Sequence, residues 1–156
     1  YTNTTGRKDI VKMKVAKDEN NLYFYVDTAE NLTTPEGDTW MTLFIDSSSK
    51  DTAKWYGYDY KIDPASGNGY KCDNSSAWTQ IAKATVKDEG NKLMLSVARK
   101  DLGIGAGVDI QFKWADNYQK NELGTYDVWS FYCDGDAAPY GRLNYVFSEV
   151  AHSAAK

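Results

Sequence analysis

The stretch Leu22-Tyr23-Phe24-Tyr25-Val26-Asp27 places an apolar side chain at every second position. Successive side chains of a β-strand point to opposite faces of a sheet, so this alternation predicts a strand with Leu22, Phe24 and Val26 on a core face. The preceding segment repeats the pattern, because Val11, Met13 and Val15 alternate with two lysines. The polar run of residues 17–21 joins the two segments, so we expect a β-hairpin.

Similar signals continue along the rest of the chain. Residues 40–45 are apolar on both faces apart from Thr42, as is typical of a strand in the middle of a packed sheet. The sequence shows no helical repeat longer than one or two turns, although residues 99–102 predict a short helical turn before Gly103. Turn-forming residues separate further predicted strands at residues 56–62, 81–86, 92–98, 110–115, 128–133 and 142–148.

Many short strands at this spacing predict an all-β antiparallel sandwich or barrel. The chain has 156 residues, which fit one domain, so we expect residues 1–156 to form a single module. It begins at Tyr1 and contains neither a signal segment nor an apolar stretch long enough to span a bilayer. We therefore expect a module excised from a longer protein, without membrane insertion.

The composition restricts the class of partner. Hydrophobic residues make up 42% of the chain, and the aromatic share of 14% is dominated by twelve Tyr and five Trp. The net charge is -4, the isoelectric point is near 5.0, and no basic cluster is present. These features argue against nucleic acid or an anionic membrane surface and favour a neutral ligand.

Catalytic and cofactor motifs are missing from the sequence. The only histidine is His152, near the carboxyl end, so a nucleophilic triad or an imidazole metal site is not expected. Residues 103–107 are Gly-rich but lack the Lys and the helix of a phosphate-binding loop. Haem ligation would fall to His152 or to Met13, Met41 and Met94, which are expected in the core. We therefore expect a protein that is not itself an enzyme.

The two cysteines leave two alternatives open. Cys72 and Cys133 could form a disulfide in an oxidising compartment, or they could be two buried thiols. Their spacing matches no zinc pattern.

Carboxylates at expected strand ends are candidates for a hard cation. Asp134, Asp136 and Asp116 lie in such loops, and calcium prefers oxygen ligands, so they form a candidate calcium site. The alternative for each is a solvated carboxylate in a turn. A catalytic carboxylate pair acting on a glycosidic bond is a further alternative, but the abundance of acidic residues makes that signal unspecific.

Aromatic residues near loops are the main functional signal. Trp40 and Trp114 lie within apolar strand patterns and are expected in the core. Exposed aromatic rings can stack on the C–H faces of sugars, whereas a structural role at one end of the sandwich is the alternative for each ring. Arg142 could bond sugar hydroxyls, pair with Asp136 or hold its loop to the sandwich. The candidate carbohydrate-binding residues are Trp55, Tyr56, Trp78, Trp129, Tyr140 and Arg142.

Several phrases occur in an order that resembles a known family. They are Gly6-Arg7-Lys8-Asp9-Ile10, residues 21–26, Trp40-Met41-Thr42-Leu43-Phe44-Ile45-Asp46, Trp55-Tyr56-Gly57-Tyr58-Asp59-Tyr60, Phe112-Lys113-Trp114-Ala115-Asp116-Asn117 and residues 135–145. Together they resemble a family 9-type carbohydrate-binding module over nearly the whole chain. The resemblance is to the branch appended to large secreted bacterial proteins that act on glycans.

The resemblance implies a β-sandwich of the jelly-roll or immunoglobulin-like kind, often with structural calcium. It implies a non-catalytic module that binds polysaccharide or oligosaccharide through loop aromatics and targets an attached glycan-active enzyme, such as a glycoside hydrolase. It also implies a secreted or cell-surface location in bacteria. Members carry another strand or two before the phrase at Gly6, so a sheet edge here is either open or completed by preceding protein.

The principal alternative is a structural module. In that hypothesis the sandwich is a spacer or packs on a neighbouring domain of the parent protein without binding glycan, and the loop aromatics are buried. Solvent exposure of these rings bears on the two hypotheses.

Overall fold

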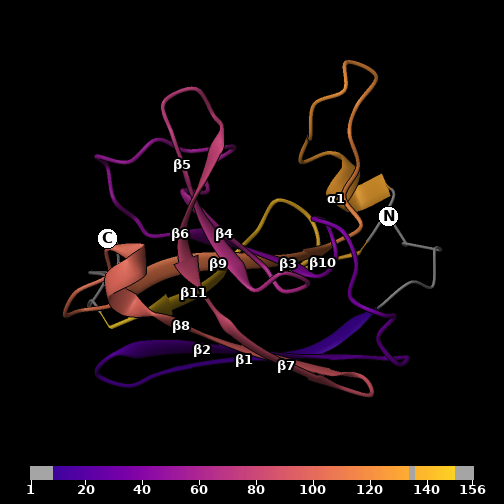
Figure 1. Cartoon of the computed structure of the whole chain (residues 1–156), viewed down its shortest axis with the longest axis horizontal. Helices are drawn as coiled ribbons and strands as arrows, with labels where there is room; N and C mark the ends of the chain where they lie inside the picture. Colours follow the sequence, from indigo (N-terminus) through magenta and orange to yellow (C-terminus); the bar gives the residue numbers. More distant parts are fainter. Residues whose placement is uncertain (1–8, 134–135, 150–156) are drawn as a thin grey trace, which may run out of the picture.

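The structure is a computed structural model that describes residues 9–133 and 136–149; the side chains of Tyr132 and Cys133 lie outside this description. Over these residues, two antiparallel sheets of four and seven strands lie one above the other, which confirms the predicted all-β sandwich (Figure 1). No helix in the described ranges is long and apolar enough to cross a lipid bilayer.

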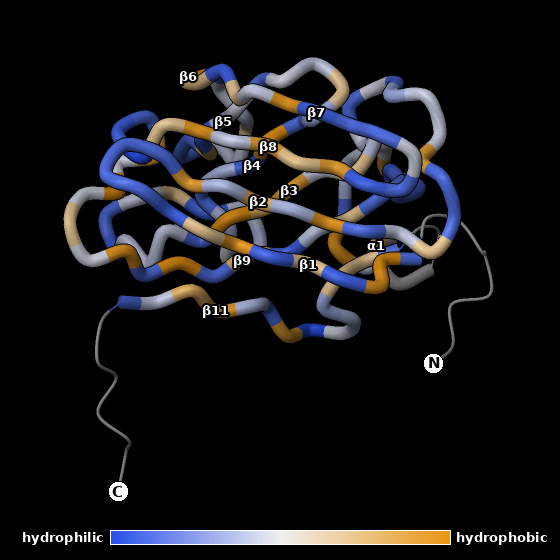
Figure 2. The backbone as a smooth tube through the Cα atoms, turned by 90° about the horizontal axis from the view of Figure 1, so that it is seen from below, coloured by the Kyte–Doolittle hydropathy of each residue, from blue (hydrophilic) through white to orange (hydrophobic). Residues whose placement is uncertain are grey.

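The four-stranded sheet contains the predicted hairpin and lies at the bottom of Figure 1. Its core face comes from alternate residues: Leu22, Phe24 and Val26 are fully buried, as predicted. Figure 2 shows the four strands side by side, with hydrophobic and hydrophilic residues alternating along them. The order is β1 (Ile10–Lys17), β2 (Asn21–Thr28), β8 (Lys92–Ala98) and β7 (Thr85–Glu89).

Two predictions of core position on this sheet are wrong. The pairing of β1 with β2 shifts register between Ile10 and Lys12, which turns Val11 away from the core and leaves it 63% exposed. A bulge inserts one residue and so reverses the face of the residues before it. Met94 is also exposed, because Leu93 and Leu95 on either side of it face the core.

The seven-stranded sheet forms the middle layer of Figure 1. Two short strands, β10 and β11, pair with different parts of β9 on the edge away from β3. The strands of this sheet are, in spatial order, β10 (Asp136–Ala138), β9 (Asp109–Asp116), β3 (Thr42–Asp46), β4 (Tyr60–Asp63), β5 (Asn68–Cys72) and β6 (Trp78–Lys83), and β11 (Tyr145–Ser148) pairs with β9.

The strand predicted at residues 128–133 is not present. The Oδ1 atom of Asp127 accepts a hydrogen bond from the Trp129 N–H at 2.8 Å, and the Ser130 hydroxyl donates to the Asp127 carbonyl oxygen. Such local bonds favour a turn over a sheet ladder, and the chain forms the single helical turn α1 (Ser130–Cys133). The helical turn predicted at residues 99–102 is confirmed as the 3-10 turn η1 (Arg99–Leu102), which ends at Gly103 with a φ of 62°.

The main hydrophobic core lies between the two sheets. Phe24 of the smaller sheet and Phe112 of the larger one meet edge to face, with ring centroids 5.2 Å apart. Trp40 and Trp114 belong to this core, as predicted, and the Trp40 indole N–H donates to the Thr33 hydroxyl at 3.0 Å. This core joins the two layers and leaves the other face of the larger sheet free for a second cluster.

That second cluster lies on the outer face of the seven-stranded sheet. Phe44 is buried there because its neighbours Leu43 and Ile45 face the first core. The cluster is made of Phe44, Trp55, Tyr58, Cys72, Ala115, Tyr118, Phe131 and Ala137. Its covering loops rise above the larger sheet, on the side away from the four-stranded sheet (Figure 1). The candidate site is built on these loops.

For Cys72 the structure has the second of the two alternatives, a buried thiol. Cys72 is a free, buried thiol in the second cluster, and burial raises its pKa. The side chain of Cys133 lies outside the described part of the chain, so its burial remains a prediction.

Candidate functional site

A two-residue turn presents Tyr56 to solvent. Trp55 and Tyr58 form a narrow pair through two backbone hydrogen bonds of 2.8 and 3.0 Å, which leaves Tyr56 and Gly57 at the tip. Both have positive φ, 49° and 94°, as in a type I′ turn. Glycine adopts this backbone freely, but a tyrosine does so at a cost of roughly 1–2 kcal/mol. The Tyr56 ring meets the Trp55 ring edge to face, with centroids 4.9 Å apart, and the side chain is still 58% exposed.

One groove lies beside Tyr56 and is named here the Trp129 groove. It has a volume of about 370 Å³, and the exposed Trp129 side chain forms part of its wall. The groove combines aromatic rings with a few polar groups, which is the usual composition of a small-molecule site. Its lining residues are Tyr56, Tyr58, Val128, Trp129, Phe131, Arg142 and Asn144.

Polar contacts fix the floor and rim of the Trp129 groove. The Tyr58 hydroxyl donates to Oδ1 of Asn144 at 2.6 Å, and the Asn144 amide donates to Oε1 of Gln111 at 3.3 Å. The guanidinium of Arg142 lies over the Trp129 ring, with its central carbon 5.3 Å from the ring centroid. The groove is therefore held by side chains from three separate segments of the chain.

Lys113 anchors the loop that carries Arg142. Its ammonium donates to the carbonyl oxygen of Gly141, the residue before Arg142. The Lys113 side chain is buried on the outer face of β9, and this burial lowers its pKa to about 8. Lys113 thus ties the rim of the groove to the seven-stranded sheet.

A second groove, named here the Trp78 groove, lies on the other side of Tyr56. It has a volume of about 690 Å³ and takes its walls from the segments before β4, before β6 and before α1. The three segments rise from the same side of the larger sheet (Figure 1). Its lining residues are Lys54, Trp55, Tyr56, Ser75, Ser76, Trp78, Lys120, Gly124, Thr125 and Tyr126.

Cations lie over the aromatic walls of the Trp78 groove. The ammonium of Lys61 is 5.2 Å from the ring centroids of both Trp78 and Tyr70, and its burial lowers its pKa. In the same groove, the ammonium of Lys120 is 5.2 Å from the Tyr126 ring centroid. The Tyr126 hydroxyl donates to Asp38 at 3.1 Å, which fixes this ring.

The structure brings together most of the residues that the sequence predicts for sugar binding. Tyr56, Trp129 and Arg142 are exposed in the Trp129 groove, and the half-buried Trp78 lines the second groove. Trp55 also lines the second groove but is only 9% exposed, because it packs in the second cluster. Tyr140 is exposed and lines neither groove.

The sequence does not predict several residues that line the grooves, among them Tyr58, Lys120, Tyr126 and Asn144. One available signal is Gly57 between Trp55 and Tyr58, because glycine readily adopts the positive φ that a two-residue hairpin turn requires. That turn places Tyr58 beside Trp55. Lys120 and Tyr126 form their own isolated bridge in a loop, and no local pattern predicts which face of the sheet that loop covers.

The structure places two of the three predicted metal ligands side by side. Asp116 and Asp136 are directly paired across β9 and β10, and Asp116 is fully buried. Oδ1 of Asp116 accepts from the Met41 N–H at 3.1 Å, and Oδ2 of Asp136 accepts from the Ile10 N–H at 2.8 Å. Asp134 lies outside the described residues.

Calcium takes six to eight oxygen ligands. In the described ranges no group of three or more His, Cys, Asp or Glu side chains is arranged to hold a metal ion. The two described carboxylates would supply only part of a calcium shell, so calcium stays a prediction.

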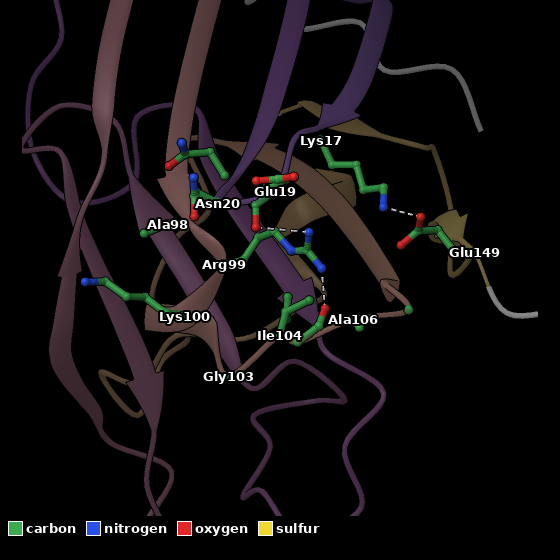
Figure 3. A pocket seen from close by; sticks show the side chains of 13 residues that line it. Lys17, Glu19, Asn20, Ala98, Arg99, Lys100, Gly103, Ile104, Ala106 and Glu149 are labelled. Atoms are coloured by element: carbon green, nitrogen blue, oxygen red, sulfur yellow. Dashed lines mark hydrogen bonds and ion pairs between the residues drawn. The ribbon is translucent and has the colours of Figure 1, made fainter.

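A third cavity, of about 880 Å³, lies where the β1–β2 turn, η1 and the segment before β9 meet. Figure 3 shows Arg99 in its centre and the ion pair of Lys17 with Glu149 at one side. The Arg99 guanidinium donates to the carbonyl oxygens of Asp18, at 2.9 Å, and Gly105, so it joins two loops. None of the described residues that line it is aromatic, and none of them is a predicted binding residue.

Comparison of the chain with models of protein families, with curated proteins and with solved structures found no match. The resemblance to family 9-type modules therefore remains a prediction from the sequence.

Proposed function

We propose that this domain is a non-catalytic carbohydrate-binding module that targets an attached glycan-active enzyme to its polysaccharide. The observation that carries the proposal is the exposed Tyr56 side chain, held by an unfavourable backbone between two aromatic grooves. Unfavourable backbone conformations persist where the surrounding structure enforces them, and they cluster at ligand sites.

The chemistry of the two grooves supports a sugar ligand. Sugar rings have apolar C–H faces that pack on aromatic rings, and Tyr56 and Trp129 offer exposed rings of this kind. Sugar hydroxyls require hydrogen-bond partners, and Asn144, Ser75 and Thr125 lie among the lining residues. Because Tyr56 lines both grooves, an extended glycan could contact both at once.

Affinity electrophoresis against a panel of polysaccharides tests the proposal. We expect at least one glycan to retard the wild-type domain, and we expect Tyr56→Ala and Trp129→Ala to migrate as they do without glycan. Tyr25→Ala is the matched control, because Tyr25 lies on the outward face of β2 in the other sheet. If no glycan retards the wild type, the proposal is wrong.

A structural module that packs on a neighbouring domain is the second candidate. The packing of Trp55 and Trp78 against Phe44 favours a structural role for these two rings. The exposure of Tyr56 and Trp129 favours the binding proposal, since buried rings were the expectation of the structural hypothesis. The same variants separate the two, because a spacer retains no glycan in either wild-type or mutant form.

A further inference from the structure

The two grooves beside Tyr56 differ in charge from the rest of the chain. The whole protein has a net charge of -4. Among the described residues that line the two grooves there is no Asp or Glu, whereas Lys54, Lys120 and Arg142 are present. The grooves are therefore locally cationic on an acidic protein.

Two of these three cations are available to a ligand. Lys54 is neutralised within the protein, because its ammonium lies 2.5 Å from Asp46 and 3.6 Å from Asp59. In the described part of the chain, Lys120 and Arg142 form no ion pair with a carboxylate. Each instead lies over an aromatic ring, of Tyr126 and Trp129 respectively.

Carboxylates lie near both walls, but neither Asp38 nor Asp127 is among the lining residues of the grooves. Oδ1 of Asp127 accepts the Trp129 N–H in the turn before α1, and Asp38 accepts the Tyr126 hydroxyl beside Lys120. Glu122 is exposed on the same loop as Lys120 and does not line the groove. A cation held over an aromatic face at the edge of a groove has its charge fixed beside the place where a sugar ring would stack.

We infer that the ligand is an acidic polysaccharide, whose sugar rings pack on Tyr56 and Trp129 and whose carboxylates pair with Arg142 and Lys120. This inference rests on the proposed function and revises the expectation of a neutral ligand drawn from overall charge. A guanidinium presents two parallel N–H donors that match the two oxygens of a carboxylate. A neutral sugar has no carboxylate. Repulsion by the net negative protein is overcome only where the local charge is positive.

The test compares each acidic polymer with its own carboxyl-reduced form, so that only the charge differs. Polygalacturonate, alginate and glucuronoxylan form such pairs, and neutral cellulose and unsubstituted xylan complete the panel. We expect at least one acidic polymer to bind at least tenfold more tightly than its reduced form. We also expect binding to weaken several-fold between about 20 and 200 mM salt, as exposed charge pairs are screened over this range.

Variants that remove one positive charge show which cations bind the acidic polymer. We expect Arg142→Gln and Lys120→Gln each to reduce binding of the acidic polymer several-fold, and Arg142→Lys to recover part of the loss. Lys87→Gln makes the same change in net charge on the exposed face of β7 and should bind as the wild type does.

The outcomes separate the two proposals. Equal binding of acidic and reduced polymers, or binding to neutral polymers alone, overturns the acidic-ligand inference and leaves the carbohydrate-binding function standing. Binding to no polymer in the panel overturns both.

Discussion

The indole ring of Trp55 is stacked on the ring of Phe44, with centroids 5.3 Å apart and planes inclined by 20°. Trp55 therefore holds the loop after β3 to the outer face of the larger sheet, rather than standing free for a ligand. We expect Trp55→Ala to lower the free energy of unfolding by about 3–5 kcal/mol, as for other large-to-small core changes. Urea unfolding measures this, and a loss below about 1 kcal/mol would contradict the structural role.

The turn at Tyr56 allows backbone preference to be separated from ring contacts. Tyr56→Asn and Tyr56→Ala both remove the ring, which lies edge to face with Trp55 at 4.9 Å. Asn adopts positive φ far more readily than Ala, and Asn-Gly is a preferred type I′ turn. We expect the Asn variant to be about 1 kcal/mol more stable than the Ala variant and both to lose glycan binding. Equal stabilities, measured by urea unfolding, would show that the turn imposes no such cost.

Lys113 makes stability depend on pH. Its pKa is about 8 in the folded protein because of burial and near 10.5 when unfolded, so the unfolded chain binds more protons between these values. The contribution of Lys113 to stability therefore rises with pH through that window. We expect the wild type to gain about 1 kcal/mol relative to Lys113→Met between pH 7 and 9.

Urea unfolding of both proteins at the two pH values gives this difference directly. Because both proteins contain the other titrating groups, the contributions of those groups to stability cancel in the comparison. Lys61, whose pKa is also lowered by burial, is one of them. Parallel stabilities of wild type and variant across the range would show that Lys113 is not desolvated.

Calcium binding is tested by thermal unfolding in excess calcium and in chelator. A ligand that binds only the folded state stabilises it by about 2.7 kcal/mol at a hundred times its dissociation constant. We expect calcium to raise the unfolding midpoint of the wild type and to leave Asp136→Asn unchanged. Asp88→Asn, on the exposed end of β7, is the control and should respond as the wild type does. If the unfolding midpoint of the wild type is the same in calcium and in chelator, the predicted calcium site does not exist.

The fold follows from local patterns wherever a strand has one buried face. The alternation at residues 22–27 predicts β2 and its core side chains. Leu22, Phe24 and Val26 are all buried, as predicted. The sequence pattern does not predict β5, because apolar and polar residues do not alternate along it. It is nevertheless paired on both sides, and a Cβ at Gly69 would lie 2.9 Å from the Cβ of Ala82 on β6. Only the neighbouring strand explains why glycine stands there.

The candidate site is less predictable because its parts come from distant segments. Loop position alone cannot distinguish Trp55 from Trp129, since both adjoin polar turns. The difference arises from Phe44, whose ring on the outer face of β3 gives Trp55 a packing partner. The predicted strand at residues 128–133 fails for a related reason, because the Asp127 side chain forms a turn that projects Trp129 outward.

The most direct test is the affinity of one glycan for four proteins, each shown to be folded by circular dichroism: the wild type, Tyr56→Asn, Trp129→Ala and Tyr25→Ala. Isothermal titration calorimetry, with the glycan chosen from the electrophoresis panel, gives each affinity. We predict that the wild type and Tyr25→Ala bind equally, and that Tyr56→Asn and Trp129→Ala bind at least tenfold more weakly. Equal affinity in all four proteins would contradict the claim that the surface around Tyr56 binds carbohydrate.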